Sequence, residues 1–493
     1  MTLSDLLSSL PSYKTAQAGC AGAADVDITD ITADSRHASP GAMFVATRGV
    51  SVDGHQFIAK AIENGATCVV AERIPEGGLE MLPSHLIYII VENSVEALGM
   101  LADKYFGSPS RKLTLVGVTG TNGKTTIATL LYEMHMAAGI PAGLISTVEN
   151  RIAAEREAAT HTTPDVITIH RLLRRMVDAG CRFAAMEVSS HAAHQRRIAG
   201  LHFAGGIFSN LTRDHLDYHK TLQNYLLAKQ SFFDSLGSDA FALTNADESH
   251  GAIMLQNTRA QKASYSLRGT GTFNGRIIED RLGGMLIEID RTEVETRLTG
   301  RFNASNMLAV YGAMRLLGHD KDTVLRLLSL AEPPAGRMQT MTKGGIAVVV
   351  DYAHTPDALA NVLGTLAEAV RHTSGSIITV VGAGGDRDRG KRPLMAAEAV
   401  KASRMAVFTS DNPRHEEPAA IIDDMLEGVG DEFRHKVEVC IDRREAIRRA
   451  IFLARPGDAV LIAGKGHEDY QIIGDVKSHF DDREEVAAAL ASL

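Results

Sequence analysis

The chain has 493 residues, of which 45% are hydrophobic and 23% are charged, and its mean hydropathy is -0.04. This balance is typical of globular proteins, and a prior of about 150 residues per domain predicts roughly three domains. The net charge of -9, the lack of Trp and the low aromatic content of 5% argue against a nucleic-acid-binding surface, which needs basic patches and stacking rings.

The sequence also gives no sign of membrane insertion or export. It has no uninterrupted apolar run of about 18 residues, which a membrane-spanning helix needs. The first stretch, "MTLSDLLSSLPSYK", carries Asp5 and no basic residue before Lys14, unlike a secretory signal peptide. The four cysteines are far apart and form no CxxC pair, which suits free thiols in a reducing compartment. We therefore expect a cytoplasmic protein.

The first predicted unit, residues 26–108, alternates short apolar runs with turns rich in Gly and Asp. "GAMFVATRG" and "ATCVVAE" are typical of strands, and "HQFIAKAIENGA" between them has helical periodicity. The segment at 106–112, "FGSPSRK", concentrates Gly, Pro, Ser and charge, which is typical of a linker. These patterns predict a small α/β unit followed by a linker.

The next unit begins with "LTLVGVTGTNGKTTIATLLYEMHMAAGIPAG", which predicts a strand, a glycine turn and a helix. Further apolar runs end in polar residues at "CRFAAMEVSSH", "FAGGIFSNLTRDH" and "DAFALTNADE". Buried parallel strands deliver side chains to the carboxyl edge of a sheet in this way, so we expect a doubly wound fold. The alternation over residues 265–298 predicts an antiparallel addition at the edge of this domain.

A helical segment, "NASNMLAVYGAMRLLG", precedes a second predicted linker at 331–337, "AEPPAGR". Beyond it, "GIAVVVDYAH", "SIITVVGAGGD", "RMAVFTSDN" and "DAVLIAGKG" are four strand-like runs separated by helical stretches. This order predicts a third, nucleotide-fold-like α/β domain.

The segment at 118–127, "VTGTNGKTTI", carries a phosphate-binding pattern between a predicted strand and helix. Its glycines let backbone N–H groups curl around phosphate oxygens, Lys124 can reach the terminal phosphates, and the Thr125 hydroxyl can bind Mg²⁺. The strict pattern has Gly where this chain has Val118, and Gly120 takes over the tight turn. The loop predicts nucleotide binding but does not distinguish a motor, a switch, a kinase or a ligase.

Polar residues at the ends of two further predicted strands are candidate metal ligands. Glu187 ends one strand, and Asp214, His215 and Asp217 follow another. Because parallel strands end at one edge of a sheet, these side chains are expected near the phosphate loop.

Eight motifs occur in order along the chain: "GTNGKTT", "EVSSHAAHQRRI", "SNLTRDHLDYH", "GRFNASNMLA", "DYAHTPDAL", "GAGGDRDRGKRP", "DNPRHEEP" and "AGKGHEDYQ". With them the whole chain resembles the Mur ligase family, ATP-dependent synthetases that build the peptidoglycan stem peptide. The resemblance implies three α/β domains. Residues 1–108 would bind the UDP end of the substrate, 109–333 would form a doubly wound P-loop domain for ATP, and 334–493 a Rossmann-like domain for the incoming amino acid.

The resemblance also implies the reaction, that of an ATP-dependent carboxylate-amine ligase in peptidoglycan precursor synthesis. ATP would phosphorylate the D-glutamyl γ-carboxylate of UDP-N-acetylmuramoyl-L-Ala-D-Glu, and the amine of meso-2,6-diaminopimelate would displace phosphate from the acyl phosphate. Mg²⁺ is the implied cofactor, ATP is a co-substrate, and a monomer with small-molecule partners only is expected.

Site residues carry over where this sequence matches the family's motifs. The implied ATP-binding residues are Gly120, Thr121, Asn122, Gly123, Lys124, Thr125, Thr126, Asn303, Asn306, Arg337 and Asp351. Those for the UDP-linked substrate are Ser35, Val50, Ser51, Val52, His161, Thr162, Thr163, Ser189, Gln195 and Arg197. Those for diaminopimelate are Arg387, Asp411, Asn412, Pro413, Arg414, Gly464 and Glu468.

The stretch "SDNPRHEEP" at 410–418 bears on the choice of amine. Asp411 and Asn412 can accept hydrogen bonds from ammonium groups, and Arg414 can fork onto a carboxylate. Diaminopimelate differs from lysine by one distal carboxylate, so a cation at this place favours diaminopimelate.

Lys229, in "NYLLAKQSFF", would be a solvated helix lysine by sequence alone. The resemblance places it at the family's carbamylated lysine. A bare ammonium would repel Mg²⁺, whereas a carbamate formed with CO₂ offers oxygen ligands. The expected metal ligands are then Thr125, Glu187, His215 and the Lys229 carbamate, and the expected catalytic residues are Lys124, Lys229, Glu187 and His215.

Two alternatives stay open. One is a relative with the same ATP chemistry, either an L-lysine-adding enzyme or another Mur or folylpolyglutamate-type ligase. The other belongs to a different class, a nucleotide-dependent switch without ligase activity, whose ATP turnover would not depend on a UDP-sugar peptide.

Overall fold

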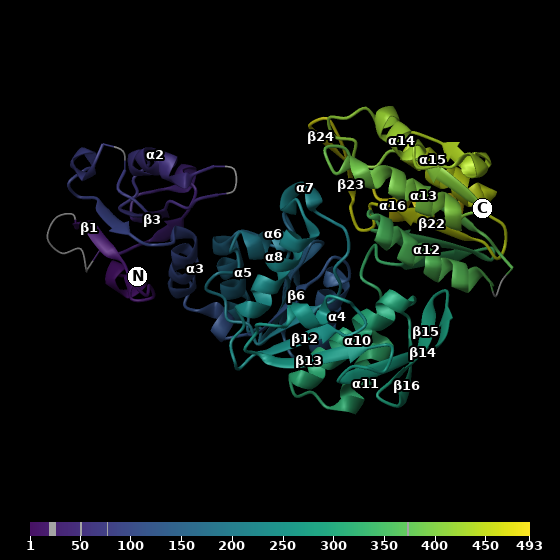
Figure 1. Cartoon of the computed structure of the whole chain (residues 1–493), viewed down its shortest axis with the longest axis horizontal. Coiled ribbons are helices and arrows are strands. Elements are labelled where there is room, and N and C mark those ends of the chain that lie inside the picture. The colour runs from purple at the N-terminus through teal and green to yellow at the C-terminus, as the bar shows by residue number, and fades with distance from the viewer. Residues whose placement is uncertain (19–25, 50–51, 76, 372–373) are drawn as a thin grey trace.

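The computed structural model places three α/β units one after another along the chain (Figure 1). The structure describes residues 1–18, 26–49, 52–75, 77–371 and 374–493. In Figure 1 the N-terminal unit is purple, the central unit is teal and the C-terminal unit runs from green to yellow. The predicted boundary after residue 108 lies directly before a short 3-10 helix (Pro109–Arg111), and the one after 333 lies outside helices and strands; we keep both as proposals.

The N-terminal unit has a five-stranded sheet in the order β1-β5-β4-β3-β2. Its elements are α1 (Leu3–Leu7), β1 (Lys14–Ala18), β2 (Asp30–Thr32), β3 (Ala42–Val45), α2 (Ile58–Glu63), β4 (Cys68–Ala71), β5 (Ile87–Ile90) and α3 (Ser94–Tyr105). Successive strand residues point to opposite faces, so Val70 packs with α1 and α3 while Val69 packs with α2.

The central unit has an eleven-stranded sheet in the order β16-β15-β14-β13-β12-β11-β6-β10-β7-β8-β9. Its strands are β6 (Thr114–Thr119), β7 (Ala142–Ile145), β8 (Glu149–Ile152), β9 (Glu155–Ala158), β10 (Phe183–Glu187), β11 (Gly205–Phe208), β12 (Phe241–Asn245), β13 (Gln261–Ser266), β14 (Phe273–Arg281), β15 (Gly284–Ile289) and β16 (Thr292–Thr296). β7, β10, β6, β11, β12 and β13 run parallel, and β14 to β16 form the predicted antiparallel addition.

Helices cover both faces of the central sheet, as a doubly wound fold requires. They are α4 (Lys124–Ala137), α5 (Val166–Asp178), α6 (Ser190–His194), α7 (Leu216–His219), α8 (Leu222–Asp234), α9 (Gly251–Met254), α10 (Arg301–Leu316) and α11 (Lys321–Leu330). One core joins the sheet to α4, α10 and α11, and a second joins it to α5, α8 and α9. The chain leaves β6 for β7 on one side and later leaves β10 for β11 on the other side, so the sheet's switch point lies at the carboxyl ends of β6 and β10.

The C-terminal unit has a six-stranded sheet in the order β17-β18-β22-β19-β20-β21 and a separate hairpin of β23 and β24. Its elements are β17 (Gln339–Lys343), β18 (Ile346–Asp351), α12 (Pro356–Arg371), β19 (Ile377–Val381), α13 (Arg392–Ala402), β20 (Met405–Phe408), α14 (Pro418–Leu426), β21 (Val437–Val439), α15 (Arg443–Leu453), β22 (Ala459–Ala463), β23 (Tyr470–Ile473), β24 (Val476–His479) and α16 (Asp482–Ala491). β18, β22, β19 and β20 are parallel, so the segments that follow them meet at one edge.

Candidate active site

The phosphate loop follows β6 and leads directly into α4. Its two glycines have positive φ angles, +150° for Gly120 and +88° for Gly123. A Cβ added to Gly120 would lie 1.9 Å from Ser209 Oγ, and one added to Gly123 would lie 2.5 Å from Asn306 Oδ1. Both positions therefore need glycine, for their backbone conformation and for space.

Lys124, the first residue of α4, folds its side chain back over this loop. Its Nζ donates hydrogen bonds to the carbonyl oxygens of Gly120 at 3.0 Å and Thr121 at 2.8 Å. Withdrawal from water lowers the pKa of Lys124, against the opposing effect of Glu187. The ammonium thus lies where the oxygens of a bound phosphate would offer it charged acceptors.

Glu187 and Thr125 bring two oxygen donors together beside the loop. Glu187 is fully buried at the end of β10, and its Oε1 accepts from Thr125 Oγ1 at 2.9 Å and from the Thr147 backbone N–H at 2.8 Å. Arg337, from the C-terminal side of the second linker, donates to Thr125 Oγ1 at 3.2 Å. Thr125 and Glu187, two of the predicted metal ligands, therefore lie together at one edge of the central sheet. Within the described residues, however, His, Cys, Asp and Glu alone form no metal-binding group of three or more.

Lys229 is buried, contrary to the solvated lysine that its helix suggests by sequence alone. Its exposed fraction on α8 is 1%, and its Nζ donates to the carbonyl oxygen of Gly120 at 2.7 Å. The Nζ also lies 4.6 Å from the centre of the Tyr225 ring. Burial holds the pKa of Lys229 well below its ordinary value, and the charge of Lys124 lowers it further. Two lysine side chains thus share one acceptor, Gly120 O.

His215 lies at the start of α7, in a left-handed backbone conformation with φ of 54°. Its Nε2 is 3.4 Å from Asp214 Oδ2, and its ring centre is 4.9 Å from that of His191. Burial raises the pKa of Asp214, but His215 and other nearby cations outweigh this and keep the pKa below its usual value. The side chain of Asp217 is outside the described part of the structure.

A cavity of about 620 Å³ opens beside the phosphate loop, between the central and C-terminal units. Six predicted ATP-binding residues line it: Asn122, Gly123, Thr126, Asn306, Arg337 and Asp351. Asn303 is buried behind it and accepts a hydrogen bond from Asn306 Nδ2 at 3.2 Å. The cavity wall also contains Arg268, Arg301 and Phe302, which the sequence did not single out.

A second cavity, of about 910 Å³, lies between the N-terminal and central units. Gln195 and Arg197 line it, and Arg197 Nη2 donates to Gln195 Oε1 at 2.7 Å. Ser35 is buried and Val52 is 51% exposed, and neither is among the described residues of the cavity wall. The N-terminal unit contributes Thr32, Asp34, His37, Thr47 and Arg48 to the wall of this cavity, and the sequence did not indicate these residues. Val50 and Ser51 lie outside the described residues.

The other residues predicted for the UDP-linked substrate lie further along the central unit. Thr163 Oγ1 donates to the Glu187 backbone oxygen at 2.8 Å and lies 3.3 Å from Ser189 Oγ, while Arg197 Nη1 donates to Thr163 O at 2.9 Å. His161 and Thr162, just before Thr163, line a third cavity. The predicted set therefore extends from one cavity to the other.

The third cavity, of about 580 Å³, lies where the C-terminal strand ends face the central unit. The predicted amino-acid-binding residues in its wall are Arg387, Asp411, Asn412, Arg414, Gly464 and Glu468, and His161, Thr162, Asp214 and His215 face them. Pro413 is buried and lies outside the wall, with its backbone oxygen against Gly385. The cavity is thus lined by residues predicted to bind the amino acid and also by residues predicted to bind the UDP-linked substrate, which are the two reactants of the bond-forming step.

Lys465 organises the part of this cavity that is rich in carboxylates. Its side chain is fully buried, and its Nζ donates to Asn412 Oδ1 at 2.9 Å and to Tyr470 O at 2.7 Å. The same Nζ is 3.2 Å from Asp411 Oδ1 and 3.9 Å from Glu468 Oε2. One buried cation therefore joins the "DNPR" and "AGKGHED" segments.

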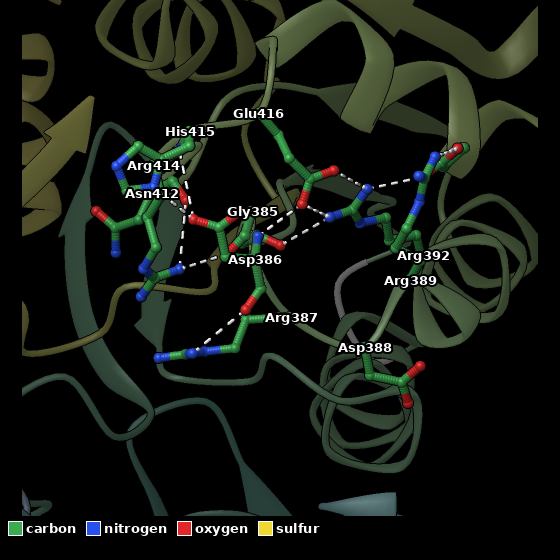
Figure 2. A network of polar contacts seen from close by, with 12 residues as sticks. Gly385, Asp386, Arg387, Asp388, Arg389, Arg392, Asn412, Arg414, His415 and Glu416 are labelled. Carbon is green, nitrogen blue, oxygen red and sulfur yellow. Dashed lines mark hydrogen bonds and ion pairs between the residues drawn. The ribbon is translucent and has the colours of Figure 1, made fainter. Parts of the chain in front are cut away.

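Arg387 and Arg414 mark another part of the cavity (Figure 2). Arg414 Nη1 donates to Gly385 O at 2.8 Å, and Arg387 Nη1 donates to Asp386 O at 3.3 Å. Among the described residues, neither guanidinium forms an ion pair with a carboxylate. Two guanidinium groups that contact only carbonyl oxygens favour an anionic ligand.

His354 also lines this cavity, and so do Lys391, His467 and Tyr470, which were not selected from the sequence. Burial, together with the charge of Lys391, lowers the pKa of His354 to about 4, so its imidazole is neutral at neutral pH. Lys391 and His354 lie within the quoted motifs "GDRDRGKRP" and "DYAHTPD". Only their position at the shared strand edge distinguishes them from surface residues.

Comparisons with known proteins agree along the whole chain. Residues 27–106, 118–314 and 336–466 match, in that order, the Mur ligase family catalytic domain, the Mur ligase middle domain and the Mur ligase glutamate ligase domain. Two relatives are named UDP-N-acetylmuramoyl-L-alanyl-D-glutamate--2,6-diaminopimelate ligase. The one from Parabacteroides distasonis is 55% identical over 94% of this chain and 95% of its own, and the one from Lactiplantibacillus plantarum is 42% identical over 100% and 99%.

A solved structure with the same name aligns with a TM-score of 0.70 and 32% identity, over 100% of this chain and 99% of that one. The predicted three-domain α/β fold is therefore confirmed. In the described part of the chain, we find no helix with the length and apolarity that a bilayer crossing requires. On the extent and identity of these matches, the chain belongs to the Mur ligase family.

Proposed function

We propose that this protein is an ATP-dependent ligase that joins meso-2,6-diaminopimelate to the D-glutamyl γ-carboxylate of UDP-N-acetylmuramoyl-L-Ala-D-Glu. The third cavity carries this proposal, since it places beside a cluster of carboxylates two guanidinium groups that form no ion pair within the described part of the chain. Relatives that align along nearly the whole chain are named for this activity. The reaction would take place in the cytoplasm, where ATP and the UDP-linked precursor are supplied.

The 620 Å³ cavity and the phosphate loop would hold ATP. A carboxylate is a poor acyl donor, so transfer of the γ-phosphoryl group to the D-glutamyl carboxylate gives an acyl phosphate with a good leaving group. Lys124 would place its charge against the phosphoryl oxygens, which is the electrostatic positioning that phosphoryl transfer requires. The amine then forms the C–N bond, phosphate departs, and the amine loses a proton.

The donors near the phosphate loop suit Mg²⁺. Thr125 and Glu187 offer a hydroxyl and a buried carboxylate within hydrogen-bonding distance, and hard oxygen donors are what Mg²⁺ prefers. His215 and a carbamate on Lys229 would complete the protein's share of the ligands. When bound, the ion would neutralise charge on the phosphoryl oxygens.

The carbamate on Lys229 is supported by the surroundings of its Nζ. The amine is buried, has Lys124 as a neighbour, and its lowered pKa favours the neutral form. A neutral amine can attack CO₂, forming an N–C bond and losing one proton, which gives an anionic carbamate. This group would turn a repelling cation into a ligand for the metal.

The amino acid would bind with its two ends on different parts of the third cavity. Asp411 and Glu468 would receive an ammonium group, and Arg387 and Arg414 would receive the distal carboxylate. L-Lysine lacks that carboxylate, so it would leave both guanidinium groups without an anion.

The UDP end would occupy the 910 Å³ cavity beside Gln195 and Arg197. From there the peptide would pass Thr163 and Ser189 toward His161 and Thr162 in the third cavity. We accordingly assign residues 1–108 to UDP binding, 109–333 to ATP binding and 334–493 to amino-acid binding.

The test is phosphate release with Mg²⁺, ATP and UDP-N-acetylmuramoyl-L-Ala-D-Glu, with meso-diaminopimelate or L-lysine added in parallel. Mass spectrometry identifies the products. We expect phosphate release that depends on diaminopimelate, with an adduct of that amino acid alone. A lysine adduct at a similar rate would overturn the assignment of Arg414, and no adduct with either amine would overturn the proposed reaction.

A further inference from the structure

The guanidinium groups of Arg387 and Arg414 in the third cavity belong to different loops. Arg387 lies in the segment at 384–389 after β19, and Arg414 lies in the segment at 411–416 after β20. A forked contact with one carboxylate depends on the relative position of both arginines, and a displacement of about 1 Å is enough to weaken such binding. Several contacts join the two loops and bear on specificity: Gly385 N–H donates to Asn412 O at 2.9 Å, Arg414 Nη1 donates to Gly385 O at 2.8 Å, and His415 Nδ1 lies 2.9 Å from Asp386 Oδ2.

Glu416 makes a further contact between the loops, and its carboxylate is the one that a buried guanidinium holds in place (Figure 2). Its Oε1 accepts a hydrogen bond from the backbone N–H of Asp386 at 2.6 Å. Asp386 directly precedes Arg387, while Glu416 itself comes two residues after Arg414. One carboxylate thus ties the backbone of the first arginine-bearing loop to the second loop.

Arg392, at the start of α13, holds the Glu416 carboxylate in place. Its side chain is fully buried and donates to the two oxygens of Glu416 at 2.7 and 2.9 Å. It also donates to Gly384 O at 3.2 Å and to Asp424 Oδ2 at 2.7 Å. A planar guanidinium that is bound on several sides leaves the carboxylate little freedom. The hydrogen bonds from Arg392 also hold the pKa of Glu416 below its ordinary value, so the carboxylate is charged at neutral pH.

The second arginine is held by its backbone as well. Arg414 has a φ angle of 51°, in the left-handed region that non-glycine residues adopt only when their surroundings impose it. Its N–H donates to Ile472 O at 3.1 Å, and its own oxygen accepts from the Gly474 N–H at 2.7 Å. The β23–β24 hairpin therefore holds the backbone of Arg414. The Glu416 bridge ties the loop that carries Arg414 to the loop that carries Arg387.

We propose that Glu416 is the positioning residue that sets the spacing of Arg387 and Arg414, and with it the preference for an amino acid that carries a second carboxylate. The inference rests on the proposed function, because it takes the distal carboxylate of diaminopimelate as the group held. Loss of the bridge displaces the two guanidinium groups relative to each other. This weakens the grip on diaminopimelate and leaves lysine, which lacks that group, unaffected.

The test compares the full-length enzyme with Glu416→Gln, which keeps the size of the side chain and removes its charge. We expect the KM for diaminopimelate to rise about 10–100-fold, while the KM values for ATP and the UDP-linked substrate stay within about twofold. The ratio of kcat/KM for diaminopimelate to that for L-lysine falls by the same factor.

Asp424→Asn is the matched control, because Asp424 pairs with the same Arg392 but does not contact the Asp386 backbone. Its KM for diaminopimelate should stay within about threefold of wild type. Equal losses in both variants, or a parallel rise of all three KM values, would overturn the proposal by showing general structural support.

A second variant covers the case in which Glu416→Gln lowers the unfolding midpoint. Glu416→Asp keeps the charge on Arg392 but shortens the reach to the Asp386 N–H by one methylene, so we expect a smaller rise in the same KM. A wild-type KM in Glu416→Asp would overturn the bridging role. A wild-type enzyme that forms no diaminopimelate adduct would overturn both the proposed function and this inference. If wild type forms the adduct and only the variants behave differently from the expectation, the inference about Glu416 fails while the proposed function stands.

Discussion

Two buried lysines, in different units, have opposite surroundings. Lys229 and Lys465 have exposed fractions of 1% and 0%, and each donates a hydrogen bond to a backbone carbonyl. Lys465 has Asp411 at 3.2 Å and Glu468 at 3.9 Å beside its Nζ. Lys229 has a carbonyl oxygen, the face of Tyr225 and the neighbouring cation of Lys124.

The difference indicates what each site is built to hold. A buried ammonium is costly unless it is paired, and of these two lysines only Lys465 has carboxylates within 4 Å among the residues that the structure describes. The surroundings of Lys465 stabilise a cation, and that cation in turn fixes Asp411 and Asn412. The surroundings of Lys229 disfavour a cation, which is consistent with a lysine that is chemically modified before it acts.

The largest effect is expected from Lys229→Ala. If Lys229 acts as a carbamate that holds the metal, the variant should lose about 10²–10³-fold in kcat, because charge stabilisation at the transferring phosphoryl group is lost. The measurement is phosphate release with all three substrates. Lys262→Ala removes an exposed lysine from β13 of the same unit and should leave kcat unchanged.

Removal of CO₂ and bicarbonate provides the complementary test of Lys229. Wild-type enzyme prepared without them should lose activity and regain it when bicarbonate is added, whereas Lys229→Ala should not respond. An active Lys229→Ala enzyme, or a wild-type enzyme indifferent to bicarbonate, would contradict the carbamate and remove the contrast between the two lysines.

A smaller effect, confined to one substrate, is expected from Lys465→Met. The variant leaves Asp411 buried without its cation and Asn412 Oδ1 without its charged donor, so the KM for diaminopimelate should rise about 30-fold or more. The KM for ATP should be unchanged, because Lys465 is not among the residues that line the ATP cavity. Steady-state kinetics with each substrate varied in turn make this measurement.

Asp411→Asn provides the control for Lys465→Met. If the two residues act through each other, the double variant should cost less than the sum of the single variants, with a coupling of about 0.5–3 kcal/mol. Additive losses would indicate that Lys465 supports the fold and does not act by pairing with Asp411. The contrast drawn between Lys465 and Lys229 would then fail on the side of Lys465.

The same contrast shows how far the sequence predicts the molecule. The three α/β units, the doubly wound centre and the phosphate loop follow from local patterns, because strand, glycine turn and helix are adjacent in the chain. Lys465 is harder to select, since a lysine between two glycines is typical of a surface loop. Its burial depends on β23 and on the "DNPR" loop, which lies about 50 residues earlier.

The UDP-binding residues show a second limit of the sequence. Ser35 and Val52 were expected at the substrate cavity, and among the described residues neither lines it. Asp34, next to Ser35, does line the cavity, while the Ser35 backbone oxygen accepts from Asn64 Nδ2 at 2.8 Å. Ser35 begins a short 3-10 helix (Ser35–His37), where a shift of one residue changes which side chain faces the cavity, and sequence spacing does not resolve that choice.

The smallest effect is expected in the pH dependence of labelling with ¹³C-bicarbonate. The lowered pKa of Lys229 leaves more of its amine neutral at neutral pH than in an ordinary lysine, and only the neutral amine attacks CO₂. As pH falls through this lowered pKa the ammonium forms, so a carbamate signal seen by NMR should decrease as the pH is lowered. Lys465, beside two carboxylates, should give no signal. The signal should therefore vanish in Lys229→Ala and persist in Lys465→Met, and the reverse pattern would assign the modified lysine to the C-terminal unit.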